Sequence, residues 1–258
     1  MRVDDKTVRD AFEEHFHRYV EGKDWDIGER VKMWEMARRA FGQSSLNNDF
    51  HDLYESLGKW QVFRRGVTHW PESETFNALV KCDTQLAKYR LSCICKDDLP
   101  AIWKLIESVQ RIKENKSGRP SVVAVSKFLH FWNPRLFVIV DDGVVWKWVF
   151  GHQWLRKQVE QTREQTDPFL DTIGKHDDSV CDLPTYAAVL VWASQLVREN
   201  PCIVSEFGKY IGSKVKTPVP EEVAEYEAAA VEWFLLGLVE LRPAGVTTEE
   251  YDVPPKKE

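Results

Sequence analysis

The chain has 258 residues, of which 43% are hydrophobic and 29% charged, and its net charge is −6 at pH 7. This composition is typical of a folded globular protein and excludes a disordered or collagen-like chain. No apolar run approaches the roughly 18 residues of a membrane helix, and the five cysteines lack the spacing of a disulfide scaffold. The first residues, MRVDDKTVRDAFEEHF, are too charged for a signal peptide, so we expect a cytoplasmic protein with free thiols.

The N-terminal part of the sequence predicts four helices from apolar residues that recur every three or four positions. The expected ranges are 5–19, 29–41, 48–57 and 73–94. Acidic residues Asp4 and Asp5 favour the start of the first helix, and Gly42 and Gly58 are expected to end the next two. Ser73 is the expected N-cap of the fourth.

The remainder of the chain also has a mainly helical pattern. The expected ranges are 99–112, 121–132, 143–150, 152–166, 184–199, 201–212 and 220–241. Asn133-Pro134 should end the helix before it, because a residue that precedes proline disfavours the α conformation. Short extended or strand-like pieces are expected at 60–63 and 137–140.

These elements predict a mainly α, compact multi-helix protein with at most minor β structure. We expect residues 1–241 to form a single helical domain, with the loop at 167–182 as a candidate internal boundary. The last residues, 242–258, are rich in proline and charge and are expected to be a disordered tail.

Two features of composition depart from the average. The chain contains 11 tryptophans, most of which we expect in the core. Residues 101–160 carry ten Lys or Arg against five Asp or Glu, whereas the rest of the chain has 25 basic and 36 acidic residues. A basic centre in an acidic chain is typical either of a surface that binds a polyanion or of an ordinary solvated helix face.

The most distinctive stretch is GRPSVVAVSKFLHFWNPRLFVIVDDGVVWKW, residues 118–148. It predicts a glycine turn, a buried helix, a proline-stopped loop, an apolar extended run and then the pair Asp141-Asp142 at the start of another helix. Carboxylates that directly follow a buried run are costly to bury. The pair must therefore lie at an edge, where it either caps the next helix or carries out chemistry.

This stretch resembles the helix-hairpin-helix DNA glycosylase superfamily, including its oxoguanine glycosylase branch. In that family a glycine-containing hairpin leads into a buried helix, and a proline-bearing loop and a short apolar run then lead to the catalytic aspartate. Without gaps, Gly118 takes the first hairpin glycine, Ala124 a small helix position and Asp141 the catalytic aspartate. The resemblance implies that Asp141 stabilises positive charge on the sugar or activates water, while hairpin N–H groups bind phosphate.

Three positions depart from the family pattern. Pro120 replaces the second hairpin glycine and lacks the N–H donor that would face phosphate. Val122 occupies the position of the lysine that some members use as a Schiff-base nucleophile, and Lys127 is not its equivalent. Gly143 stands where a histidine usually follows the aspartate. The resemblance therefore implies either a monofunctional DNA N-glycosylase that uses Asp-driven hydrolysis, or a related fold whose chemistry is lost.

The same stretch supplies the other candidate site residues. The expected nucleic-acid-binding residues are Lys116, Gly118, Arg119, Ser121 and Lys127. A flipped base needs an aromatic or apolar pocket and a group that reads its edge, so Trp132, Trp146 and Asp142 are the pocket candidates. The sequence predicts no cofactor and no metal, because it contains no GxGxxG, Walker, GxSxG or HExxH motif.

Two other functions remain open. The chain could be a non-enzymatic helical module with a degenerate glycosylase-like fold, in which exposed aromatic residues contact an unidentified protein partner. Alternatively, His51-Asp52 together with His15 or His17 resembles metal-dependent phosphohydrolases of the HD type, which are also all-α.

Two further motifs are expected to be structural. Cys93 and Cys95 form a C-x-C pair without a second pair at zinc-finger spacing, so we expect buried thiols on a helix. His130 lies at the apolar centre of SKFLHFW, where we expect a hydrogen-bonded core histidine.

Overall fold

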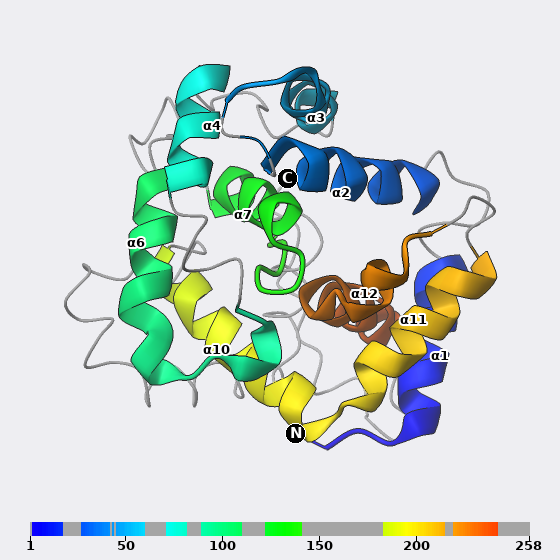
Figure 1. Ribbon diagram of the computed structural model, residues 1–258. Coiled ribbons are helices and arrows are strands. Elements are labelled where there is room, and N and C mark those ends of the chain that lie inside the picture. Colours follow the sequence, from blue (N-terminus) through cyan, green and yellow to red (C-terminus); the bar gives the residue numbers. More distant parts are fainter. Residues whose placement is uncertain are drawn as a thin grey trace, which may run out of the picture.

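The computed structural model describes residues 2–17, 27–41, 43, 45–59, 71–81, 89–109, 122–140, 183–214 and 219–241 (Figure 1). Within these ranges the chain forms nine α-helices, three short 3-10 helices and no strand, which confirms a mainly α fold. The α-helices are α1 (Asp5–His15), α2 (Ile27–Phe41), α3 (Asn48–Lys59), α4 (Glu72–Lys81), α6 (Leu99–Val109), α7 (Val122–Trp132), α10 (Leu183–Glu199), α11 (Cys202–Lys214) and α12 (Glu227–Glu240). The 3-10 helices are η2 (Leu91–Cys93), η3 (Lys96–Asp98) and η5 (Glu221–Glu225).

The helix α7 lies at the centre of the fold, with α2, α6, α10 and α12 around it (Figure 1). Ten of its eleven residues are buried, as expected for a helix that is apolar on almost every side. It contacts α2 and α6, while α12 packs against α1, α10 and α11. Every turn of α7 therefore faces protein.

Local sequence explains several helix starts. The Asp4 carboxylate accepts a hydrogen bond from the Thr7 backbone N–H at 2.9 Å and caps α1. The Asn47 side chain accepts from the Phe50 N–H at 2.9 Å and caps α3 in the same way. Ser73 was the expected cap of the fourth helix, but α4 begins at Glu72, so Ser73 lies inside the helix instead.

Two predicted helices are shorter than expected. The helix expected at 73–94 does not reach Ile94, because Arg90 is extended and Leu91–Cys93 form a 3-10 turn. The helix expected at 220–241 is interrupted at Tyr226, which separates η5 from α12. Tertiary contacts account for this interruption. The Tyr226 ring lies edge-on against Trp34 at 5.2 Å between ring centroids, and the Glu227 carboxylate accepts hydrogen bonds from the backbone N–H and hydroxyl of Ser92.

Several expected features lie outside the described residues. They are the strand-like piece at 60–63, the hairpin around Gly118, the helices at 143–150 and 152–166, the candidate boundary at 167–182 and the tail at 242–258. No helix in the described part of the chain has the length and apolar character of a membrane span.

Candidate functional site

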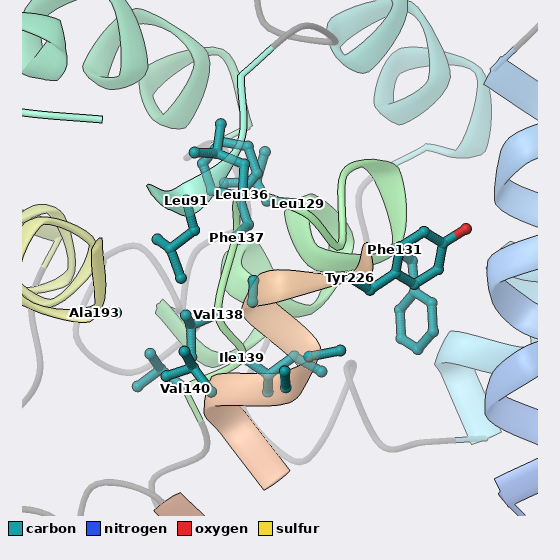
Figure 2. Packing of buried hydrophobic residues seen from close by; sticks show 14 of the residues in the cluster. Leu91, Leu129, Phe131, Leu136, Phe137, Val138, Ile139, Val140, Ala193 and Tyr226 are labelled. Atoms are coloured by element: carbon teal, nitrogen blue, oxygen red, sulfur yellow. The ribbon is translucent and has the colours of Figure 1, made fainter. Parts of the chain in front are cut away.

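The chain turns sharply after α7 and runs back along it. The Asn133 carbonyl accepts hydrogen bonds from the N–H groups of Leu136 and Phe137 at 3.0 and 3.1 Å, which closes the turn at Pro134. The following residues, 136–140, are at most 2% exposed (Figure 2). They form the buried run, which ends one residue before Asp141.

The buried run is not a strand, although its sequence is β-branched and apolar. Side chains of neighbouring helices bind its backbone in place of a second strand. His130 Nδ1 lies 2.7 Å from the Phe137 carbonyl oxygen, and the Tyr186 hydroxyl donates to the Val138 carbonyl at 3.0 Å. Such pairing is required, since a buried backbone group without a partner costs as much as a lost hydrogen bond.

Ser126 holds the end of the buried run. Its hydroxyl oxygen accepts a hydrogen bond from the Val140 N–H at 3.0 Å, and it lies 3.3 Å from the Val140 carbonyl oxygen. The same hydroxyl lies 3.0 Å from the Val123 carbonyl oxygen, so its single proton is shared between two acceptors. Val140, the last described residue before Asp141, is thus held against α7.

The direction of the run places its end near the start of α7. His130, in the last turn of α7, binds Phe137, whereas Ser126, one turn earlier, binds Val140. Ser126 is four residues from Val122, the first residue of α7, which is about 6 Å along the helix axis. Val140, the last described residue of the buried run, therefore lies towards the N-terminal end of α7.

His130 is held as a neutral imidazole. Its Nε2 accepts a hydrogen bond from Trp34 Nε1 at 3.2 Å, so Nδ1 carries the proton and donates it to the Phe137 carbonyl. Burial lowers the pKa of His130 to about 3, with a smaller contribution from the charge of Arg30. The expectation of a hydrogen-bonded core histidine is confirmed.

We predict that acid destabilises the protein through His130 and His15. Burial lowers the pKa of His15 to about 3 as well, again with a smaller contribution from Arg30. Because the unfolded chain binds these protons below about pH 6.5, the free energy of unfolding should fall by up to about 1.4 kcal/mol per pH unit for each histidine. This loss should develop as the pH decreases from 6.5 towards about 3 and be absent above that window.

Urea unfolding of the wild type and of His130→Gln at a series of pH values measures this slope. The variant should show a flatter dependence on pH, whatever its absolute stability. The control is His51→Gln, because the hydrogen bond from His51 to Glu72 raises the pKa of this exposed histidine. Protonated His51 therefore stabilises the folded protein at low pH, and this contribution to the free energy of unfolding is lost as the pH rises. An unchanged slope in His130→Gln would contradict the prediction.

We also predict that Ser126→Ala lowers the free energy of unfolding by about 1–3 kcal/mol, because the buried Val140 N–H loses its partner. Ser205→Ala is the matched control. This exposed hydroxyl donates to the Cys202 carbonyl within α11, and its loss should change stability by less than about 0.5 kcal/mol. Chemical denaturation of both variants gives the comparison. Equal effects would show that Ser126 does not hold the buried run.

The structure describes two of the predicted site residues, Lys127 and Trp132, and both are 8% exposed. Trp132 packs against Phe41 and Phe137, with ring centroids 6.3 Å away in each case. Its Nε1 has no hydrogen-bond partner among the described residues. Lys127 is buried, whereas a lysine that binds phosphate at the protein surface would be exposed.

The other predicted site residues lie outside the described residues. They are Lys116, Gly118, Arg119, Ser121, Asp141, Asp142 and Trp146. Sequence reasoning missed Ser126 and Tyr186, whose only signal is a hydroxyl on an otherwise apolar helix. Val122, at the position of the family's lysine, is 5% exposed.

The histidines of the HD-type alternative do not assemble into a metal site. His15 is buried, stacked on Trp233 at 5.0 Å and 3.5 Å from the Tyr210 hydroxyl. His51 is exposed on α3 and pairs with Glu72. Among the residues that the structure describes, no three His, Cys, Asp or Glu side chains gather as metal ligands would. The described residues therefore do not form the metal site that the sequence suggested for His51-Asp52 with His15 or His17.

Comparisons with protein-family models, with curated proteins and with solved structures each found no match.

Proposed function

We propose that the protein interacts with DNA and, through Asp141, hydrolyses an N-glycosidic bond as base-excision DNA glycosylases do. The observation that carries this proposal is the course of the buried run. It brings the residue before Asp141 to within about one helical turn of the start of α7. Val140 directly precedes the proposed catalytic residue in sequence, and Val122 follows the proposed phosphate-binding turn at Gly118 by four residues, so the described neighbours of both lie towards the same end of α7.

Electrostatics at this end suit both proposed tasks. The N-terminal end of a helix carries a partial positive charge, which favours a nearby carboxylate or phosphate. Ser126 and His130 hold the buried run as far as Val140, and a catalytic carboxylate must be positioned where positive charge develops on the sugar. Val122 gives no amine at the lyase position, which supports hydrolysis by a monofunctional enzyme.

The alternative of a protein-interaction module is not favoured by the described surface. Trp34, Trp132, Trp192 and Trp233 are all buried, as expected for core tryptophans. In the described ranges, Leu46 is the only large hydrophobic residue that is exposed. A docking face built on aromatic residues would need a contiguous exposed apolar patch.

Binding to a duplex that carries an abasic-site analogue tests the proposal, because this probe needs no assumption about the base. We expect fluorescence anisotropy to show tighter binding to the analogue than to the undamaged duplex, with a linear decrease in log affinity against log salt. A base-release screen follows, in which Asp141→Asn should lower the rate by about 10²–10⁴-fold.

Asp10→Asn, an exposed carboxylate on α1 with the same change of charge, is the matched control and should leave binding and release unchanged. Equal, salt-sensitive binding to both duplexes would reduce the proposal to a non-specific DNA binder. Absence of binding at low salt would overturn it.

A further inference from the structure

The C-x-C pair lies on the surface, not on a buried helical face as the sequence predicted. Cys93 is the last residue of η2, Cys95 lies between η2 and η3, and both are exposed. Ile94, between them, is completely buried. Because this isoleucine takes the inward position, its two neighbours are turned outward.

Extended backbone at Ile94 favours an arrangement in which Cys93 and Cys95 share one face of the chain. Its φ of −78° and ψ of 145° are those of an extended residue. In extended chain, alternate side chains lie on the same face, with their Cα atoms about 6.6 Å apart. The exposed–buried–exposed order of the three residues agrees with this arrangement.

The backbone that carries the thiols is held on both sides. The Ile94 carbonyl accepts hydrogen bonds from the Ser194 hydroxyl at 2.8 Å and from Arg198 Nη1 at 2.9 Å, both on α10. The Cys95 N–H donates to the Asp98 carboxylate at 2.9 Å, and the Cys93 N–H donates to the Arg90 carbonyl at 3.0 Å. The pair is therefore preorganised and loses little conformational entropy when it binds a ligand.

We infer that Cys93 and Cys95 form a two-coordinate site for a soft monovalent metal ion, with Cu(I) as the physiological candidate. Thiolates select soft ions such as Cu(I), whereas a structural zinc site requires four ligands. Among the described residues, no three His, Cys, Asp or Glu side chains group as metal ligands, and the C-x-C pair itself supplies two sulfurs. Two sulfurs suffice for linear Cu(I) coordination.

Charge at the pair favours the bound form. Binding removes one proton from each thiol, forms two Cu–S bonds and leaves copper in the same oxidation state, so the product carries one negative charge. The Arg198 guanidinium, held on the carbonyl between the two cysteines, is a cation that offsets this charge. The Asp98 carboxylate lies on the other side and opposes it, but it is engaged by the Cys95 N–H.

Anaerobic competition between the reduced full-length protein and a chromogenic Cu(I) chelator tests the inference without reference to DNA. The expected result is one tightly held Cu(I) per chain, with X-ray absorption showing two Cu–S bonds and with proton release on binding. Cys93→Ser and Cys95→Ser should each weaken binding by at least the roughly 100-fold that loss of an outer-shell partner can cost.

Cys202→Ser is the matched control. This thiol on α11 is half-buried, burial raises its pKa, and its removal should leave Cu(I) uptake unchanged. Uptake that persists in the Cys93→Ser/Cys95→Ser double variant would overturn the inference, as would the absence of uptake by the wild type. Retention of Zn(II) in place of Cu(I) would contradict the two-coordinate site. None of these outcomes depends on whether the protein binds DNA.

Discussion

Replacement of Gly237 by alanine should lower the free energy of unfolding by at least about 3 kcal/mol, at the upper end of the usual cost of overpacking. A Cβ at this position would overlap the carbonyl carbon and oxygen of Ala11. Those atoms belong to the backbone of α1 and cannot turn aside as a side chain would. The helices α1 and α12 would have to separate, although they form the most extensive helix pair among the described elements.

Two other glycines provide a graded control. At Gly212, in α11, no atom of the described residues lies within 4 Å of the place that a Cβ would take, so Gly212→Ala should stabilise the protein by about 0.4–1 kcal/mol through the unfolded chain. At Gly208 the atom nearest to an added Cβ is the Ala224 Cβ at 3.1 Å. The free energy of unfolding of Gly208→Ala should therefore lie between those of Gly237→Ala and Gly212→Ala. Urea unfolding of the three variants measures the order of their stabilities. If Gly237→Ala were as stable as Gly212→Ala, the close approach of α1 and α12 would be wrong.

Removal of one partner from the buried ion pair between α2 and α12 should cost about 3–5 kcal/mol. Arg30 Nη2 lies 2.8 Å from Glu232 Oε1, and the two side chains are 2% and 3% exposed. Arg30 also lies over the Trp233 ring, 5.4 Å from its centroid. In Glu232→Leu the guanidinium loses this carboxylate while remaining in the core, and desolvation of a charge whose partner has been removed dominates the cost.

The double variant Arg30→Met/Glu232→Leu distinguishes a lost charge balance from lost packing. We expect it to recover most of the stability, because apolar residues of similar volume replace a buried ion pair at little cost. The control pair is Arg39 and Asp49, whose separation is also 2.8 Å but whose side chains are 51% and 33% exposed. Arg39→Met should change stability by less than about 1 kcal/mol. A similar loss of stability at the buried and the exposed ion pair would show that burial does not determine the cost of removing one partner.

Local sequence patterns were enough to predict the helical class and the central helix. The apolar residues of 121–132 and the Asn133-Pro134 stop predicted a buried helix that ends at Trp132, and the structure has this helix at Val122–Trp132. Local chemistry was sufficient here, since periodicity and proline act within a few residues. The role of His130 followed from the same reasoning, because a histidine amid apolar residues must find partners in the core.

The way in which the chain before the candidate site is held depends on contacts between segments that are distant in the sequence. Residues 137–140, three of which are β-branched, have strand propensity, but side chains of α7 and α10 bind the backbone of Phe137, Val138 and Val140, and no second strand is present in the described residues. Tyr226 interrupts a continuous helical pattern because Trp34 packs against its ring. Cys93 and Cys95 are exposed because Ile94 fills the core between them. In each case the decisive partner is distant in sequence or buried by packing, and local propensity carries no information about it.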